Sequence, residues 1–315
     1  MREPSRRARV VVAFTAIVAV LGPACSPAPT ASPDVVERLQ ACGVAATHQY
    51  RSVADVDPAQ TSVDVMTPRA GSDGCDDRPL VLWVHGGGWT EGDKSEFMAD
   101  KVRLFNDAGY VFASTNYRLT DPTLEPPHPQ HPVHDEDVAA ALAWLVDHAP
   151  ELGIDAERVA VLGHSAGGGI TAAVSTDERF LAAHDLSLDT ITCAGSMDGE
   201  GYDVTAGATT APEGWRPTYT TAFGTDPAVW EDASPINHVA ADKGIPRFFV
   251  AARGVDWRVE QHLAFIDALR RAGVEVTALD TRALEHADLT TVIGSPDDTV
   301  VTPALMDFLR GCFTD

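Results

Sequence analysis

Basic residues are scarce in this sequence. Lys and Arg together number 23 against 46 Asp and Glu, so the formal net charge of the 315 residues is −23. An acidic excess of this size repels the phosphates of nucleic acid and anionic surfaces. We therefore expect no nucleic-acid partner, and the charge favours solubility outside a cell.

Long apolar runs are also missing, apart from one near the start. Residues 10–21 are apolar, but the run is too short to span a bilayer comfortably, and four arginines precede it. This pattern is typical of a signal peptide. We predict a signal peptide over residues 1–24, a flexible Ser/Pro/Ala-rich tether over 25–34 and a folded domain over 35–315. Without residues 1–24, which carry four Arg and one Glu, the net charge becomes about −26.

The export route is open between two alternatives. Ser5-Arg6-Arg7 resembles a twin-arginine signal, although basic pairs are equally typical of ordinary secretory signals. Cys25 follows Leu21-Gly22-Pro23-Ala24, which looks like a lipoprotein cleavage site with Gly22 in place of a large aliphatic residue. We expect an exported bacterial protein, either secreted or held at the cell surface by a lipid on Cys25.

Cysteine is sparse and lacks the spacing of a metal site. None of the five cysteines forms a CxxC pair, which argues against a zinc site built from them. In an oxidising compartment the four beyond Cys25 predict two disulfides, for which three pairings exist. We favour Cys42 with Cys75, and Cys193 with Cys312.

The rest of the chain alternates between strand and helix patterns. Strands are predicted over residues 79–84, 110–116, 158–162, 190–196, 247–252 and 274–279. Helices are predicted over residues 95–108, 133–148, 166–175, 257–272 and 302–313. This alternation predicts a mostly parallel sheet with helices on both faces. The pattern breaks between 199 and 239, where we expect a small cap insertion, and no internal repeat is apparent.

One motif indicates a nucleophilic serine. Gly163-His164-Ser165-Ala166-Gly167 directly follows the apolar strand that ends at Leu162, and a helix follows it. A sharp turn from strand to helix exposes the serine, and the flanking glycines are needed because a Cβ there would collide with neighbouring elements. Ser165 is therefore the predicted nucleophile.

A second motif supplies hydrogen-bond donors. His85-Gly86-Gly87-Gly88-Trp89 also follows a strand, and glycines let the backbone approach a reacting group closely. An oxyanion formed during acyl transfer needs N–H groups placed in advance. We assign this role to Gly87, Gly88 and Ala166, and we give His85 a structural role rather than a catalytic one.

The remaining partners of Ser165 are sought later in the chain, in the order acid and then histidine. Asp256 follows the strand over 247–252, and His286 follows the strand over 274–279 by a short loop. His286 is the predicted base, and Asp256 is the predicted acid that orients it. Asp280, Asp288 and Glu260 are weaker candidates for the acid.

A histidine cluster invites a metal interpretation. His128, His131 and His134 precede three acidic residues, but prolines interrupt the segment, and acids at a helix start favour the helix dipole. We therefore predict no metal site and no other cofactor.

The two motifs together resemble the α/β-hydrolases of the esterase and lipase type, in particular HGGG-bearing carboxylesterases related to hormone-sensitive lipase and arylformamidase. The resemblance spans roughly residues 61–313 and rests further on residues 137–145, Ser234-Pro235 and Phe308-Leu309. It implies an α/β-hydrolase fold with the triad Ser165, Asp256 and His286. The segment before His85 is short, so we expect no large N-terminal cap helices, and we expect Trp89, Trp215 and Tyr219 to contact the substrate.

The leading hypothesis is a serine hydrolase that cleaves carboxylic esters of small or medium acyl chains through an acyl-enzyme, with a small-molecule ester as its partner. One alternative is an arylformamidase or peptidase-like amide hydrolase with the same triad. Another is a non-catalytic binding protein of the same fold. The sequence favours no particular oligomeric state.

Overall fold

A computed structural model describes residues 43–69, 75–123 and 128–314 of the chain. The predicted signal peptide, the tether, Cys25 and Cys42 lie outside these residues. Among the described residues, no helix combines the length and the apolar character that a bilayer span requires.

The core of the molecule is a sheet of eight strands in the order β1-β2-β4-β3-β5-β6-β7-β8. β1 pairs antiparallel with β2, and β2 pairs antiparallel with β4, whereas all other neighbours are parallel. The strands are β1 (Ala45–Gln49), β2 (Ser62–Met66), β3 (Arg78–Val84), β4 (Val111–Thr115), β5 (Ile154–His164), β6 (Cys193–Met197), β7 (Arg247–Ala252) and β8 (Val276–Asp280). The predicted mostly parallel sheet is confirmed.

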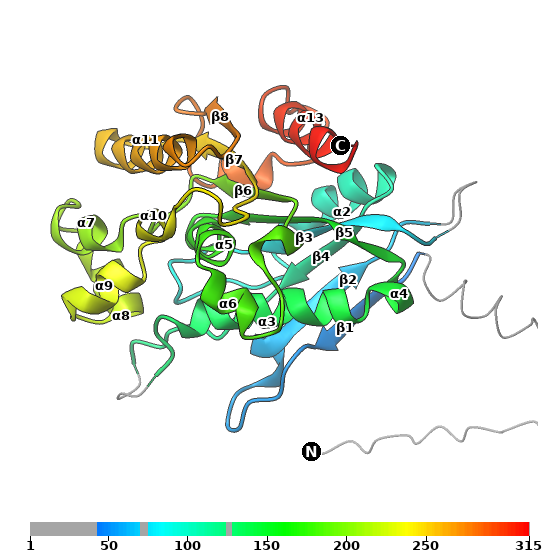
Figure 1. The fold of residues 1–315 in the computed structure, drawn as a ribbon, viewed down its shortest axis with the longest axis horizontal. Helices are drawn as coiled ribbons and strands as arrows, with labels where there is room; N and C mark the ends of the chain where they lie inside the picture. The colour runs from blue at the N-terminus through cyan, green and yellow to red at the C-terminus, as the bar shows by residue number, and fades with distance from the viewer. Residues whose placement is uncertain (1–42, 70–74, 124–127, 315) are drawn as a thin grey trace, which may run out of the picture.

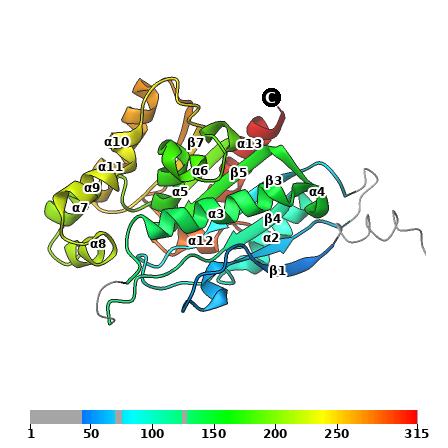
Figure 2. The same ribbon diagram turned by 60° about the horizontal axis from the view of Figure 1, so that its bottom comes forward.

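Alternate residues of the central strands face two different layers. In β5, Val159 and Val161 face the layer with α3 (Val133–Asp147) and α5 (Ala166–Thr176). Ala160 and Leu162 face the opposite layer, which contains α2 (Met98–Asp107) and α13 (Val301–Thr314). The period of two thus buries both faces of the sheet, as α/β proteins require (Figures 1 and 2).

Helix α11 (Asp256–Arg271) covers the far part of the sheet. Phe265, Ile266 and Leu269 of this helix pack against Phe248 and Val250 of β7. Helix α11 thereby packs against β7, and it contains two of the candidate acids, Asp256 and Glu260.

Four short helices connect β6 to β7. They are α7 (Val204–Thr209), α8 (Arg216–Phe223), α9 (Pro227–Asp232) and α10 (Pro235–His238). They gather at one end of the molecule, on the left in Figure 1. They occupy the segment for which a cap insertion is predicted. The remaining helices are α4 (Ala149–Leu152), α6 (Glu178–Ala182), α12 (Asp288–Thr291), η1 (Pro58–Thr61) and η2 (Leu188–Thr190).

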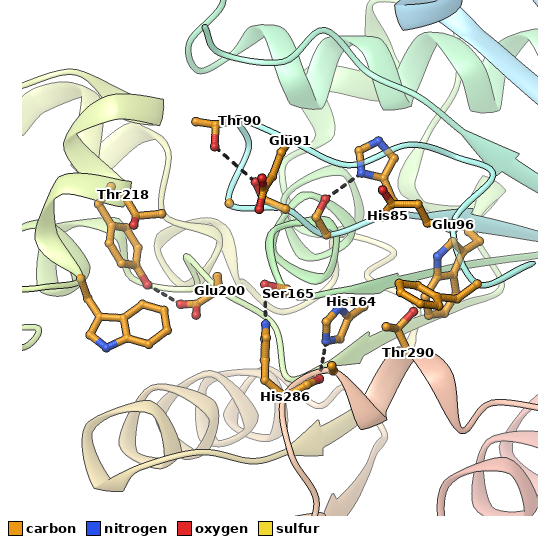
Figure 3. Close-up of a pocket in the computed structure, with 18 residues that line it drawn as sticks. His85, Thr90, Glu91, Glu96, His164, Ser165, Glu200, Thr218, His286 and Thr290 are labelled. Carbon is orange, nitrogen blue, oxygen red and sulfur yellow. Dashed lines mark hydrogen bonds between the residues drawn. The ribbon is translucent and has the colours of Figure 1, made fainter. Parts of the chain in front are cut away.

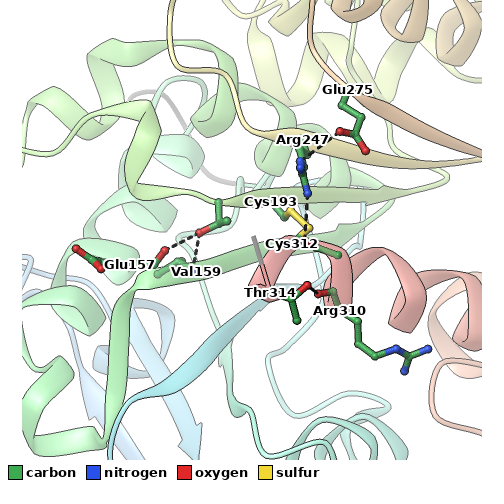
Figure 4. Close-up of a disulfide and its surroundings, with 10 residues drawn as sticks. Glu157, Val159, Cys193, Arg247, Glu275, Arg310, Cys312 and Thr314 are labelled. Carbon is green, nitrogen blue, oxygen red and sulfur yellow. Dashed lines mark hydrogen bonds and ion pairs between the residues drawn. A yellow bond between two sulfur atoms is a disulfide. The ribbon is translucent and has the colours of Figure 1, made fainter.

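A disulfide joins the sheet to the last helix. Cys193, the first residue of β6, is bonded to Cys312 of α13, with the two Cα atoms 6.2 Å apart (Figure 4). This confirms one of the two predicted pairings. Cys75 is also in a disulfide, but its predicted partner Cys42 lies outside the described residues, so that pairing stays a prediction.

Candidate active site

Ser165 lies between β5 and α5 in a strained conformation. Its φ is 55° and its ψ is −124°, a region that residues other than glycine rarely adopt. A Cβ on Gly163 would lie 2.2 Å from the carbonyl oxygen of Gly167, and a Cβ on Gly167 would lie 2.3 Å from that of Val84. Only glycine fits at these two positions, so the sequence around Ser165 is dictated by the turn itself.

His286 lies in the loop between β8 and α12 and faces the serine. The Ser165 hydroxyl donates to Nε2 of His286 over 3.0 Å (Figure 3). The ring of His164 stacks near that of His286, with centroids 4.6 Å apart, and its Nε2–H donates to the His286 carbonyl over 2.8 Å. Burial lowers the pKa of His164 to about 3, so His164 stays neutral and holds the backbone of the histidine loop.

The structure corrects the prediction for the acid. Nδ1 of His286 donates to Oδ2 of Asp198 over 2.5 Å, and Asp198 directly follows β6. Asp256 is instead the exposed first residue of α11, and among the described residues it forms no hydrogen bond or ion pair with His286. The structure therefore brings together Ser165, His286 and Asp198, and it leaves Asp256 outside this set.

Two of the three weaker candidates are also engaged elsewhere, and Glu260 is exposed on α11. Asp280 pairs with the exposed Arg282, and Asp288 accepts a hydrogen bond from the backbone N–H of Glu285. The prediction missed Asp198 because it placed the acid after the second strand beyond the nucleophile rather than after the first. The available signal was an aspartate immediately beyond the strand at 193–197, because all parallel strands end at the same edge of the sheet.

Asp198 is fully buried among basic groups. Its Oδ1 accepts from Nη2 of Arg258 over 2.7 Å, and it lies 3.5 Å from Nε2 of His262. Nη1 of Arg253 lies 3.7 Å from Oδ2. Burial raises the pKa of Asp198, but the hydrogen bond from His286 and the nearby Arg258 outweigh it and lower that pKa to about 2. Asp198 is therefore ionised at neutral pH.

The predicted oxyanion donors lie beside Ser165. Gly87 and Gly88 have φ values of 111° and 58°, and both line the cleft that holds the serine. Ala166 begins α5, where the N–H groups of the first turn have no partner within the helix. Gly87, Gly88 and Ala166 therefore stay the predicted donors to a developing oxyanion.

The cleft at Ser165 has a volume of about 450 Å³. Trp215, Thr218 and Tyr219 line the cleft together with Glu200, and Figure 3 shows Thr218 and Glu200 on the same side of it. The Tyr219 hydroxyl donates to Oε2 of Glu200 over 2.7 Å. The lining also includes Trp83, Glu91, Glu96, Phe97 and Thr290 from other loops and elements.

Trp89 differs from the two other aromatic residues predicted to contact substrate. It is 2% exposed, as Tyr219 is, but unlike Tyr219 and Trp215 it does not line the cleft. Its ring packs against Tyr219 and Phe223, with centroids 5.9 and 4.9 Å away. Trp89 therefore supports the wall of the cleft from behind, and the prediction that it contacts substrate is corrected.

The histidine cluster before α3 is engaged in hydrogen bonds. Nδ1 of His131 lies 2.8 Å from Oδ2 of Asp135, and Nε2 of His134 lies 2.9 Å from the Thr120 hydroxyl. Burial lowers the pKa of His134 to about 3. Within the described part of the chain, no group of three or more His, Cys, Asp or Glu side chains is arranged to hold a metal ion.

Solved structures share this architecture. Esterase B from Lactobacillus rhamnosis is 20% identical with a TM-score of 0.67, and the match covers 85% of this chain and 84% of the other. Esterase 2 from Thermogutta terrifontis is 22% identical with a TM-score of 0.64, covering 85% and 92%. These likenesses confirm the α/β-hydrolase fold.

Curated relatives match this chain over only part of their own length. The esterase LipC of Mycobacterium tuberculosis is 29% identical over 78% of this chain and 60% of its own length. The probable carboxylic ester hydrolase LipM of the same organism is 29% identical over 61% of this chain, and the carboxylesterase NlhH is 39% identical over 32%. The chain spans 45% of LipM and 30% of NlhH.

A family model agrees with the resemblance drawn from the two glycine motifs. The BD-FAE model matches residues 63–263, which run from β2 into α11 and include both motifs and Asp198. The match covers more than half of the chain. The chain therefore belongs to the BD-FAE family and shares the α/β-hydrolase fold of esterases.

Proposed function

We propose that this protein is a carboxylic ester hydrolase that works through an acyl-enzyme formed on Ser165. The observation that carries the proposal is the hydrogen-bonded chain from Ser165 Oγ through His286 to Asp198, beside glycine-rich backbone in an open cleft. The printed names of the relatives, which are esterases and carboxylic ester hydrolases, support the same reaction.

Each residue of the chain has a defined task in this mechanism. His286 Nε2 takes the proton of Ser165 as Oγ attacks the ester carbonyl, and it then returns that proton to the leaving alkoxide. Asp198 fixes the tautomer of His286 and stabilises the imidazolium that forms. Water attacks the acyl-enzyme in the second half of the cycle, with His286 as the base again.

The oxyanion of each tetrahedral intermediate would lie against the N–H groups of Gly87, Gly88 and Ala166. Loss of one such donor typically costs about 2.7–4 kcal/mol of transition-state stabilisation. The cleft volume of about 450 Å³ suits a small or medium acyl chain. Trp215 and Tyr219 are two of the aromatic residues that line the cleft, and we expect them to contact the acyl chain.

The test is hydrolysis of a series of p-nitrophenyl esters by the protein and by its Ser165→Ala variant. We expect turnover that falls off with long acyl chains and disappears in the variant. Stoichiometric labelling of Ser165 by a fluorophosphonate should accompany it. Labelling without ester turnover, but with turnover of anilides or formamides, would replace the ester by an amide substrate.

We also propose that the protein is exported, on the basis of residues 1–24 and of a buried disulfide that suits an oxidising compartment. A lipid on Cys25 would hold it at the cell surface. Fractionation of cells that express the full chain and its Cys25→Ser variant tests this. A membrane-bound protein that the substitution releases would support the lipid, and equal release of both would leave a secreted protein.

A further inference from the structure

A buried arginine that takes no part in the proposed reaction steps contacts the acid of the candidate triad. Arg258, in the first turn of α11, is 3% exposed. Its Nη2 donates to Oδ1 of Asp198 over 2.7 Å and to the carbonyl oxygen of the same residue over 3.1 Å. Arg258 therefore bonds Oδ1 of Asp198, and His286 bonds the other carboxylate oxygen, Oδ2.

The same guanidinium reaches the wall of the cleft. Nη1 of Arg258 forms an ion pair with Oε1 of Glu200, whose Oε2 accepts from the Tyr219 hydroxyl over 2.7 Å. Glu200 and Tyr219 both line the cleft. The Arg258 guanidinium thus pairs with two carboxylates, that of Asp198, which bonds His286, and that of Glu200, which lines the cleft.

Burial of this arginine needs compensation, and the surroundings supply it. An uncompensated buried charge is costly, and here two carboxylates offset a single guanidinium. The rings of Trp215 and Trp257 lie 5.4 and 5.9 Å from the guanidinium carbon. Gly254, with φ of 110°, makes room, because a Cβ there would lie 2.8 Å from Cδ of Arg258. The side chain is therefore packed into one position.

We propose that Arg258 is a positioning residue of this hydrolase: it locks the Asp198 carboxylate toward His286 and couples that carboxylate to Glu200 in the cleft. The proposal rests on the function proposed above. Asp198 has a φ of 44°, directly after β6, and its carboxylate needs an anchor on Oδ1 to keep Oδ2 aligned with His286. Lysine cannot replace the arginine fully, since it lacks the planar fork that reaches Asp198 and Glu200 together.

Glu200 keeps the charge of the site balanced. Without it, Arg258 would oppose the positive charge that His286 acquires in the transition state. Asp198 also faces His262 of α11 and Arg253 after β7, but each lies 3.5 Å or more from its carboxylate. Among the residues that the structure describes, Arg258 is therefore the basic group other than His286 that donates a hydrogen bond to this carboxylate.

The test compares Arg258→Gln, Arg258→Lys and Asp198→Asn with the parent protein, on p-nitrophenyl acetate from about pH 4 to pH 9. Arg258→Gln should lower kcat roughly ten- to a hundredfold with little change in KM, and should move the acid limb of the rate profile to higher pH. The reason for the shift is that removing a cation beside the Asp198–His286 pair favours the protonated form of the pair, which cannot accept the proton of Ser165. Arg258→Lys should keep the limb in place and still lose kcat several-fold. Arg271→Gln, on the exposed end of α11, is the matched control and should behave like the parent.

The outcomes separate positioning from mere stability. A folded Arg258→Gln variant with parental kcat would overturn the proposal, and so would a lower kcat with an unmoved acid limb. If Arg258→Gln does not fold, Arg258→Lys decides, because parental kcat in that variant leaves no positioning role. Full activity in Asp198→Asn would instead overturn the triad itself, which keeps the two failures distinguishable.

Discussion

The nucleophile end and the acid end of this site follow different rules. At Ser165 the chain is fixed by local geometry, because the positive φ of the serine and the close backbone contacts at Gly163 and Gly167 leave little choice of residue. At the acid end, Asp198 and Asp256 both follow strands that end at the same edge of the sheet. The local sequence alone does not distinguish these two aspartates.

Side-chain packing makes the distinction. Asp198 is fully buried and surrounded by His286, Arg258 and His262, whereas Asp256 is exposed on α11. Helix α11 thus contributes the cation rather than the acid. The nucleophile can therefore be recognised from its own motif, whereas its acid is defined by contacts between distant elements.

The largest effect is expected at the nucleophile. Ser165→Ala removes the attacking oxygen, and we expect kcat/KM for p-nitrophenyl acetate to fall by about 10⁶. Far-UV circular dichroism and the melting temperature should match the parent, because Oγ bonds only His286 among the described residues. Residual turnover at a tenth of the parental rate would remove Ser165 from the mechanism.

The next largest effect is expected at the acid. Asp198→Asn leaves the shape of the side chain but favours the wrong tautomer of His286, so kcat should fall by about 10⁴. The measurement is kcat on the same ester, with fluorophosphonate labelling as a second readout that should slow in parallel. A fall of less than tenfold would contradict the assignment of Asp198.

This contrast also explains what the sequence could predict. Both glycine motifs, the strands before them and the histidine after the last strand follow local patterns, and the structure places Ser165 and His286 together. The prediction put the acid on β7 because of its position along the chain. The acid that follows β6 is instead held by Arg258, a residue 60 positions away from Asp198. No periodicity of the sequence reveals the contact between these two residues.

The edges of the fold show the same limit. Strands β1 and β2 are absent from the prediction; β1 is only partly buried and lacks the apolar alternation of a core strand, whereas β2 has that alternation, at Val63 and Val65, over just five residues. Trp89 looks like a binding residue beside the HGGG motif, yet its side chain turns into the core against Phe223. Both depend on which neighbours the folded chain brings near.

A smaller effect should appear in stability at low pH. The pKa of Asp198 is depressed to about 2, so its contribution to the free energy of unfolding is complete above its ordinary pKa and is lost as the pH falls through about 2. A shift of this size corresponds to about 2 kcal/mol. The difference in unfolding free energy between the parent and Asp198→Asn should therefore shrink between about pH 4 and pH 2. Urea titrations at several pH values measure it, and a constant difference would contradict the ionised, paired state of Asp198.

The smallest effect is expected at Asp256, and it tests directly whether Asp198 or Asp256 is the acid. Asp256 is exposed at the first turn of α11, where an acid favours the helix dipole by about 0.5 kcal/mol. Asp256→Asn should therefore lower the melting temperature slightly and leave kcat within about twofold of the parent. The same substitution at Asp198 serves as the matched control, since both variants exchange one carboxylate for an amide beyond a parallel strand. If Asp256→Asn instead lost activity as Asp198→Asn is expected to, the acid would have to approach His286 from the end of β7. Arg258 would then bind an aspartate, Asp198, that takes no part in the reaction.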